Sequence, residues 1–365
     1  MNPPSTSEHT PGVDYHATSE RLRYEDLSPA VREAADLALG SPVVRAAAPV
    51  TSGFTKAYAG RVLLQDGRQV FLKATGPDLP IPVAALRREG QILKALGDRI
   101  PSVPLIGAVE AQDGGQVLAL DWIDGHLPGF PWTDDEVALV RAACESVATV
   151  PSSVMDGLAP GRLADDLLDD DALQAALADG PALPMSLHQL PAWLPARMDE
   201  ILGLARQGAT LLVGDHLNHF DLRPDNLLIG RGAGEASDRA YLLDCNWVTL
   251  GPSWCDWVGL IPTIHAQGYE FGQLLASSPL SRDADPEAID AFFAVIAVYM
   301  LRGLDLDPPA GTTSAVRHHQ RYYARIFLDS LATRRRWLLT SPRAQARTAC
   351  VSPRGNGVHG PSPTR

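Results

Sequence analysis

The stretch HFDLRPDN, residues 219–226, concentrates polar side chains between the apolar runs TLLVG and LLIG. An ordinary turn would use Gly, Asn or Ser here, whereas this one carries a histidine, two aspartates, an asparagine and an arginine. Asp221 can accept the proton of a hydroxyl group or orient that group, and the side-chain oxygen of Asn226 is a suitable Mg²⁺ ligand. Arg223 follows Asp221 by two residues, where its guanidinium could contact an anion. The stretch therefore predicts a site that holds charged groups.

Three further residues extend this chemistry. Lys73 lies near the end of the β-rich run VFLKA, and Glu89 lies on the helix expected next, where the two can pair. Lys73 alone would be an ordinary strand-end lysine, so its significance depends on Glu89. Asp244 ends the apolar run YLLD, eighteen residues after Asn226. Asn226 and Asp244 would thus offer two oxygen ligands from separate segments, as a Mg²⁺ site requires.

The elements expected to position these residues begin with a sheet. Asp66-Gly67 separates two β-rich runs and predicts a hairpin. A helix with Ser28 as N-cap precedes the hairpin, and a helix closed by Gly97 follows it. The expected elements are a helix at 28–40, strands at 58–64 and 68–74, a helix at 83–97 and a strand at 115–125. The first 125 residues therefore predict an antiparallel sheet with one inserted helix.

The character of the chain changes after Gly125. Thr133 and Glu136 form a capping box at the start of one helix. The stretch 285–304 is apolar nearly all round, as in a buried helix, and a last helix is expected from residue 315. A small sheet followed by a mainly helical part is typical of a two-lobed kinase. We therefore predict an α+β fold of the protein-kinase-like type, with a small antiparallel-sheet N-lobe and a larger helical C-lobe.

The spacing of the motifs narrows this prediction. His219, Asp221 and Asn226 follow the pattern H-x-D with Asn five residues after the Asp, and Asp244 follows on a strand. With these residues the chain resembles the aminoglycoside phosphotransferase family, which comprises kinase-like small-molecule phosphotransferases, over roughly residues 45–340. The resemblance implies transfer of the γ-phosphate of ATP or GTP to a hydroxyl group of a small molecule, such as an aminoglycoside-like antibiotic or a metabolite.

The resemblance also implies a role for each residue. Asn226 and Asp244 would bind Mg²⁺, which is the expected cofactor, because phosphoryl transfer requires neutralisation of charge and in-line positioning. Asp221 would accept or orient the acceptor proton, Arg223 would touch the transferring phosphate, and His219 would brace the catalytic loop. These three are the predicted catalytic residues.

The nucleotide would bind between the lobes. Small residues in TSGFTKAYAG, 51–60, would let backbone N–H groups approach phosphates, and Lys73 would reach the α- and β-phosphates. The run ALDWIDG, 119–125, would connect the lobes and meet the adenine edge. The predicted nucleotide-binding residues are Gly53, Phe54, Thr55, Lys73, Glu89, Asp121, Trp122 and Ile123.

The chain departs from the family pattern at three places. Phe220 stands where the family often has Gly, Asp244 is followed by Cys-Asn-Trp rather than Trp-Glu, and GPSWCDW replaces a Gly-Asp-Pro element. Asp256 within the last of these is expected to be a structural hydrogen-bonding residue.

Two other functions compete with this interpretation. A catalytically inactive nucleotide-binding protein would be expected to lose one of Lys73, Asp221, Asn226 or Asp244, and all four are present. A protein kinase is disfavoured because only eleven residues separate Asp244 from Asp256, with no D-F-G or A-P-E motif. That interval leaves little room for an activation segment.

The net charge, hydropathy and cysteine content of the chain narrow its possible partners and its location. The net charge of -12 argues against nucleic acid, whose phosphates would be repelled. The longest apolar run, 291–301, is short of the roughly 20 residues of a membrane span. Four cysteines show no metal or disulfide spacing, so we expect a reducing cytoplasm.

The stretch 163–180 carries six aspartates and no basic residue. If these carboxylates face the cleft, they predict a cationic acceptor, whereas on the outer face of a helix they would only be solvated.

The expected organisation has four parts. They are a disordered tail at 1–22, an N-lobe with a leading helix at 23–125, a helical C-lobe with the catalytic loop and acceptor site at 126–342, and a disordered tail at 343–365.

Overall fold

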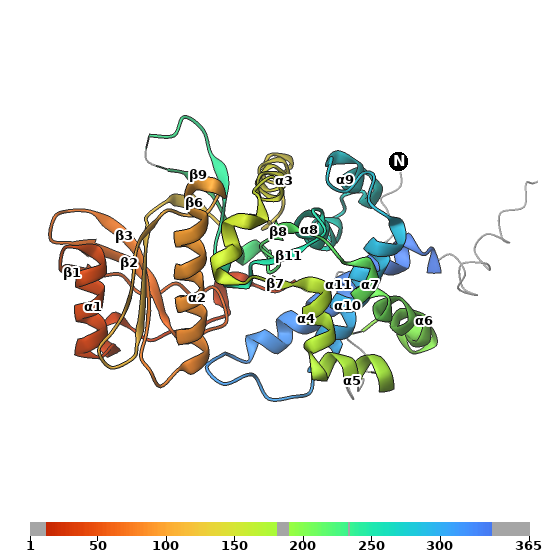
Figure 1. The fold of residues 1–365 in the computed structure, drawn as a ribbon, viewed down its shortest axis with the longest axis horizontal. Helices are drawn as coiled ribbons and strands as arrows, with labels where there is room; N and C mark the ends of the chain where they lie inside the picture. The colour runs from red at the N-terminus through yellow and green to blue at the C-terminus, as the bar shows by residue number, and fades with distance from the viewer. Residues whose placement is uncertain (1–11, 181–189, 233, 338–365) are drawn as a thin grey trace, which may run out of the picture.

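The computed structural model describes residues 12–180, 190–232 and 234–337. Figure 1 shows two lobes: a sheet flanked by helices on the left, and a larger, mainly helical lobe on the right. The two-lobe α+β fold that the sequence predicts is confirmed. The predicted C-terminal tail and residues 1–11 of the predicted N-terminal tail lie outside the described residues.

The N-lobe contains a five-stranded antiparallel sheet with the strand order β1-β2-β3-β5-β4. Its strands are β1 (Val43–Ala46), β2 (Tyr58–Leu64), β3 (Gln69–Thr75), β4 (Leu105–Glu110) and β5 (Gln116–Asp121). The predicted hairpin joins β2 to β3, and Gly67 adopts the positive φ of 88° that its turn requires. Residues 119–125 leave this sheet at β5 and lead into the C-lobe.

Two helices cover opposite faces of the sheet. Helix α1 (Pro29–Leu39) begins where Ser28 accepts a hydrogen bond from the Val31 N–H and ends at Gly40, with φ 67°. It packs on the face that buries Val117 and Ala119, while α2 (Pro80–Leu96) packs on the face that buries Leu118 and Leu120. Because side chains alternate along a strand, β5 supplies both faces. Helix α2 thereby carries Glu89 toward the C-lobe side of the sheet.

Two small sheets belong to the part of the C-lobe that carries the predicted site. In the first, β9 (Leu227–Arg231) pairs with both β10 (Arg239–Leu242) and β6 (Asp124–His126), so the strand after the predicted catalytic loop, residues 219–226, adjoins the lobe connection. In the second, β11 (Thr249–Gly251) pairs with β7 (Gly161–Arg162) and β8 (His216–Asn218). The catalytic loop therefore lies between two strands, β8 and β9, that are each fixed in a sheet.

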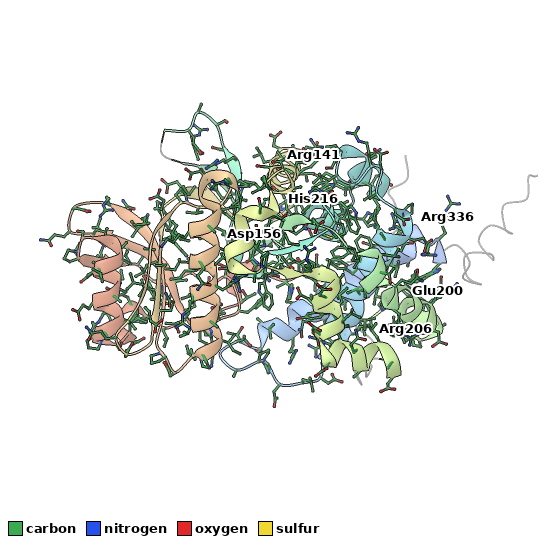
Figure 2. All side chains as sticks on the ribbon, in the orientation of Figure 1. Arg141, Asp156, Glu200, Arg206, His216 and Arg336 are labelled. Atoms are coloured by element: carbon green, nitrogen blue, oxygen red, sulfur yellow. The ribbon has the colours of Figure 1, made fainter. Side chains whose placement is uncertain are left out.

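The rest of the C-lobe is helical. Helix α10, predicted to be buried, packs against α6 and α11, and side chains fill the space between these helices (Figure 2). Arg206 of α6, labelled in the same figure, donates through Nε to the Leu177 carbonyl oxygen of α5 over 2.9 Å. The helices are α3 (Asp134–Ala148), α4 (Leu163–Asp169), α5 (Asp171–Asp179), α6 (Leu194–Arg206), α7 (Gly208–Leu211), α8 (Cys255–His265), α9 (Phe271–Ser277), α10 (Pro286–Leu301) and α11 (Ala315–Arg334). The capping box of Thr133 and Glu136 is present at the start of α3.

The N-terminal segment differs from the prediction. The expectation of disorder up to residue 22 is wrong for residues 12–22, which the structure places against the body of the protein. Val13 and Tyr15 are buried, Tyr15 begins a 3-10 turn, η1 (Tyr15–Ala17), and its hydroxyl lies 2.8 Å from Nδ1 of His319 on α11. A second turn, η2 (Tyr24–Asp26), leads into α1. The segment has no apolar period, but the buried Val13 and Tyr15 and the backbone hydrogen bonds from Thr18 and Ser19 to Thr51 dock it.

Across the described residues, no single helix combines the length and apolar character of a membrane span. The helix α3 and the following turn η4 (Ser152–Leu158) meet those criteria only as a pair, bent by 69°.

Candidate active site

The catalytic loop is held by Asp256, at the start of α8. Its buried carboxylate accepts the backbone N–H of His219 over 2.7 Å and that of Phe220 over 2.9 Å. The Nε2 atom of His219 lies 2.7 Å from the Leu243 carbonyl oxygen, which ties the loop to the segment that carries Asp244. Both residues thus brace the loop, as their positions in the sequence predict.

The backbone at Phe220 explains why a glycine is expected there. Its φ of 65° lies in the left-handed region, where a side chain costs about 1–2 kcal/mol. The two hydrogen bonds to Asp256 hold the backbone in this conformation. Its ring also packs near Phe292, with 6.4 Å between the ring centroids.

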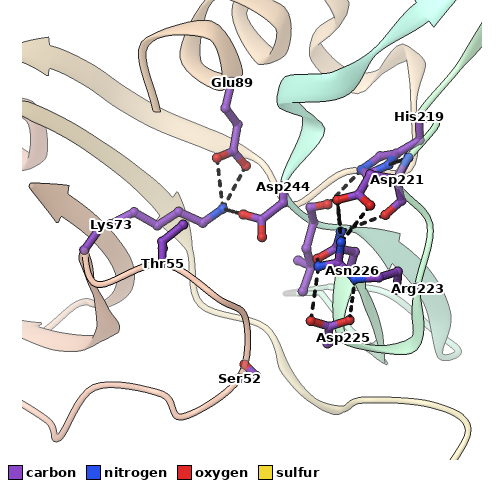
Figure 3. Close-up of polar contacts among 12 residues, drawn as sticks. Ser52, Thr55, Lys73, Glu89, His219, Asp221, Arg223, Asp225, Asn226 and Asp244 are labelled. Carbon is purple, nitrogen blue, oxygen red and sulfur yellow. Dashed lines mark hydrogen bonds and ion pairs between the residues drawn. The ribbon is translucent and has the colours of Figure 1, made fainter. Parts of the chain in front are cut away.

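Asp221 lies at the centre of the loop. The Nη1 atom of Arg223 is 2.6 Å from each of its carboxylate oxygens, and the Asn226 amide donates to its Oδ2 over 3.0 Å (Figure 3). Burial raises the pKa of Asp221 from its ordinary value, while the charge of Arg223 opposes that shift. The carboxylate is thereby held in one orientation by two neighbours of its own loop.

Arg223 is more deeply engaged than the sequence indicates. Its Nε donates to Oδ1 of Asp225 over 3.0 Å, and its guanidinium lies 5.1 Å from the ring centroid of Phe54 in the N-lobe. Asp225 is buried, although a turn residue of this kind would ordinarily be solvated. Arg223 therefore links Asp221, Asp225 and the N-lobe loop, and the sequence carries no signal for the last two contacts.

Lys73 pairs with Glu89 as predicted. Its Nζ donates to both carboxylate oxygens of Glu89, at 2.9 Å each, and also contacts Asp244 of the C-lobe (Figure 3). Burial lowers the pKa of Lys73, but the charges of Asp244 and Glu89 outweigh it, so the pKa is raised. Burial raises the pKa of Asp244, but Lys73 outweighs it and lowers that pKa to about 2. The lysine therefore joins an N-lobe helix to the segment after β10.

The side-chain oxygens of Asp244 and Asn226 are suitable ligands for a hard cation. Among the described residues, no three His, Cys, Asp or Glu side chains converge into a metal site of their own. Asp244 is ionised at neutral pH, and Asn226 adds an amide oxygen, which now accepts from Arg223 over 3.2 Å. Carboxylate and amide oxygens suit Mg²⁺, which ordinarily completes its shell with phosphate oxygens and water. The two predicted metal ligands are thus chemically suited to a metal that arrives with a nucleotide.

The loop between β1 and β2 contacts both lobes. Gly53 has a φ of 81°, and Phe54 packs against Arg223 and His319. The Phe54 carbonyl oxygen accepts the Thr313 N–H over 2.9 Å, and Thr55 forms a β-bridge with Thr312. The predicted phosphate loop is therefore joined to the segment before α11, a contact that no local pattern predicts.

The lobe connection, residues 119–125, is anchored in the core by Ala119, Leu120 and Ile123. Ile123 is buried, and Asp121, at the end of β5, donates its N–H to the Pro104 carbonyl oxygen over 2.9 Å. Trp122 donates through Nε1 to Oδ1 of Asp124 over 2.7 Å and lies under the guanidinium of Arg61. These contacts fix the segment that was predicted to meet the nucleotide base.

The acidic stretch is mostly in solvent. Asp165, Asp166, Asp169, Asp171 and Asp179 are exposed, on α4 and α5. Asp170 instead caps α5 and pairs with Arg302 over 2.6 Å.

Comparison with solved structures identifies the type of fold that this chain adopts. No protein-family model matches the sequence, and no curated protein is significantly similar to it.

Solved structures match most of the chain. Aminoglycoside 2'-phosphotransferase-IIIa, in complex with GDP, is 15% identical with a TM-score of 0.54, and the match covers 85% of this chain and 100% of that one. A thermostable variant of APH(4)-Ia, with AMP-PNP and hygromycin B, is 12% identical with a TM-score of 0.54, over 84% and 99%. Spectinomycin phosphotransferase APH(9)-Ia, with ADP and spectinomycin, is 13% identical with a TM-score of 0.50, over 83% and 97%.

The chain thus has the kinase-like fold of the aminoglycoside phosphotransferases. The resemblance drawn from His219, Asp221, Asn226 and Asp244 is confirmed at the level of the fold.

Proposed function

We propose that this chain is a phosphotransferase that moves the γ-phosphate of ATP or GTP to a hydroxyl group of a small molecule. The observation that carries the proposal is the convergence of two clusters from different lobes. Lys73 and Glu89 of the N-lobe meet Asp244, while Asp221 lies with Arg223 and Asn226 in the adjoining catalytic loop. The structures that share this fold contain GDP, ADP or AMP-PNP, in keeping with a nucleotide site.

Each residue has a chemical part in this proposal. Lys73, held by Glu89, would bind phosphate oxygens, and Asn226 and Asp244 would hold Mg²⁺. The metal would supply charge neutralisation on the phosphates. As the acceptor oxygen bonds to the γ-phosphorus and the bond to the nucleotide diphosphate breaks, the acceptor proton would pass to Asp221. Arg223 binds both carboxylate oxygens of Asp221 and would stabilise charge on the transferred group.

The remaining nucleotide contacts are proposed from the positions of the β1–β2 loop and the lobe connection in the fold. Gly53, Phe54 and Thr55 would face the phosphates, and the backbone of Asp121, Trp122 and Ile123 would face the base. Cytoplasmic location is likewise proposed, since a nucleotide substrate would be available there.

The acceptor class is proposed from two sources. Similar folds bind kanamycin, spectinomycin or hygromycin B, so hydroxyl-bearing antibiotics and metabolites are the first candidates. A cationic acceptor is supported by the net charge of -12. Replacing Asp169 and Asp171 together by Asn, with Asp170 kept because it caps α5 and pairs with Arg302, should raise the acceptor KM, most at low salt, and leave the nucleotide KM unchanged. An unchanged acceptor KM would mean that these carboxylates are a solvated face.

The experiment is a panel of acceptors incubated with ATP or GTP and Mg²⁺. Mass spectrometry should find one acceptor that gains a single phosphoryl group. Nucleotide binding without any phosphorylated product across aminoglycosides, sugars, amino sugars and amino alcohols would favour the inactive nucleotide-binding protein instead.

A further inference from the structure

The N-terminal segment contributes an arginine to the loop between β1 and β2. Arg21 lies before η2, outside residues 45–340, over which the sequence motifs resemble the phosphotransferase family. Its Nη1 donates to Oγ1 of Thr55 and to the Ala57 carbonyl oxygen, both over 3.0 Å, and its Nη2 donates to the Ser52 carbonyl oxygen over 2.8 Å. One side chain thus joins three residues of the loop that is expected to hold phosphates.

The loop is shaped around this guanidinium. At Gly53 a Cβ atom would lie 2.6 Å from Nη2 of Arg21, and the φ of 81° also favours glycine. A side chain at this position would therefore be strained and would displace the Arg21 guanidinium. The guanidinium of Arg21 and the backbone of Gly53 therefore pack directly against each other, although thirty-one residues separate them in the sequence.

The charge of Arg21 has no direct partner. Within the described ranges it forms no ion pair with a carboxylate, and its buried Nε has no hydrogen-bond partner. A guanidinium has five N–H groups, and the three bonds to the loop leave two of them unused. A partly buried cation with unused donors is unfavourable unless an anion or acceptor reaches it.

The position of Arg21 indicates which anion this would be. Burial lowers the pKa of Arg21, and the nearby charges of Asp244 and Asp225 oppose this shift. Arg21 therefore lies within electrostatic reach of the carboxylate proposed to hold Mg²⁺. The loop that Arg21 binds also lies next to the catalytic loop, because Phe54, between Ser52 and Thr55, is 5.1 Å from the guanidinium of Arg223, which binds Asp221.

We propose that Arg21 is a phosphate-binding residue of the nucleotide site, supplied by the N-terminal segment rather than by the sheet. The inference rests on the proposed nucleotide-dependent function and adds a cation to Lys73. Docking of Val13 and Tyr15 in the body of the protein holds this segment in place, with Ser19 Oγ donating to the Thr55 carbonyl oxygen over 2.8 Å. The segment thereby becomes part of the nucleotide site.

The test is calorimetry with ATP, ADP and adenosine, each with Mg²⁺, or with the guanosine series if the wild type binds that instead. The full chain is compared with Arg21→Met, with Arg21→Lys and with Arg68→Met as the matched control. Arg68 is in the β2–β3 turn, where it pairs with Asp66. Thermal melting of each variant checks that it is folded.

Arg21→Met should weaken triphosphate binding on the order of ten- to one-hundred-fold, as expected for a lost charged hydrogen bond. In Arg21→Met the affinity for the diphosphate should fall less than that for the triphosphate, and the affinity for the nucleoside should not change. Arg21→Lys should lose less triphosphate affinity than Arg21→Met. Arg68→Met should bind all three ligands like the wild type. Equal losses of affinity for the nucleoside and for the triphosphate would show that Arg21 has a purely structural role and would overturn the inference. An unchanged triphosphate affinity in folded Arg21→Met would also overturn it. A wild type that binds no nucleotide would instead refute the proposed function, and this inference with it.

Discussion

Replacing Asp256 by Ala should destabilise the protein through the catalytic loop alone. Within the described residues Asp256 forms no hydrogen bond or ion pair with Lys73 or Asp221, but its buried carboxylate accepts the N–H groups of His219 and Phe220. After the substitution, two buried donors would lose a charged acceptor. The left-handed backbone of Phe220 would lose the contacts that hold it.

The size of the effect follows from these contacts. A hydrogen bond to a charged group contributes roughly 1.5–3 kcal/mol, so two bonds contribute about 3–6 kcal/mol. Relaxation of Phe220 out of the left-handed region would recover about 1–2 kcal/mol. The expected net loss in the free energy of unfolding is therefore about 1–5 kcal/mol. Asp256→Asn should lose less, because one carbonyl acceptor remains.

Urea unfolding of the wild type, Asp256→Ala and Asp256→Asn measures these differences. Asp98→Ala is the control, since Asp98 is an exposed aspartate of the N-lobe. A loss below about 1 kcal/mol in Asp256→Ala, comparable to the control, would refute the reasoning that this carboxylate holds the loop.

Two further predictions concern Asp244 and the N-terminal segment. Lys73 lowers the pKa of Asp244 from 3.8 to about 2, so the stabilising contribution of Asp244 is fully present above 3.8 and is lost as the pH falls through about 2. The stability difference between the wild type and Asp244→Asn should therefore shrink across that window in acid unfolding, and a constant difference would argue against the pair. Deletion of residues 1–20 should lower Tm because it removes the buried Val13 and Tyr15, and a deletion mutant that melts like the full chain would show that their docking contributes nothing.

Local patterns predict the parts of the site that depend on short segments. The hairpin at Asp66-Gly67, the helix that carries Glu89 and the spacing from His219 to Asn226 are each encoded within a few consecutive residues. Lys73 and Glu89 meet because one strand and the next helix are neighbours in the fold. That pairing could be predicted from sequence order and is confirmed by the structure.

The contacts that sequence misses are long-range. Arg21 reaches a loop thirty residues later, and Tyr15 reaches His319 at the opposite end of the chain. Neither residue belongs to a periodic pattern, so only the folded chain brings them to the site. Asp225 likewise looks like a solvated turn residue until Arg223 is seen to lie against it.

The central claim is tested most directly by the turnover of Asp221→Asn on the acceptor that gains a phosphoryl group. The variant should bind nucleotide like the wild type, because Lys73 and Asp244 are intact, and its kcat should fall on the order of 10²–10⁴-fold. Asp98→Asn, measured alongside, should keep the wild-type kcat. Turnover of Asp221→Asn close to that of the wild type would contradict the claim that this carboxylate is at the centre of a phosphotransferase site.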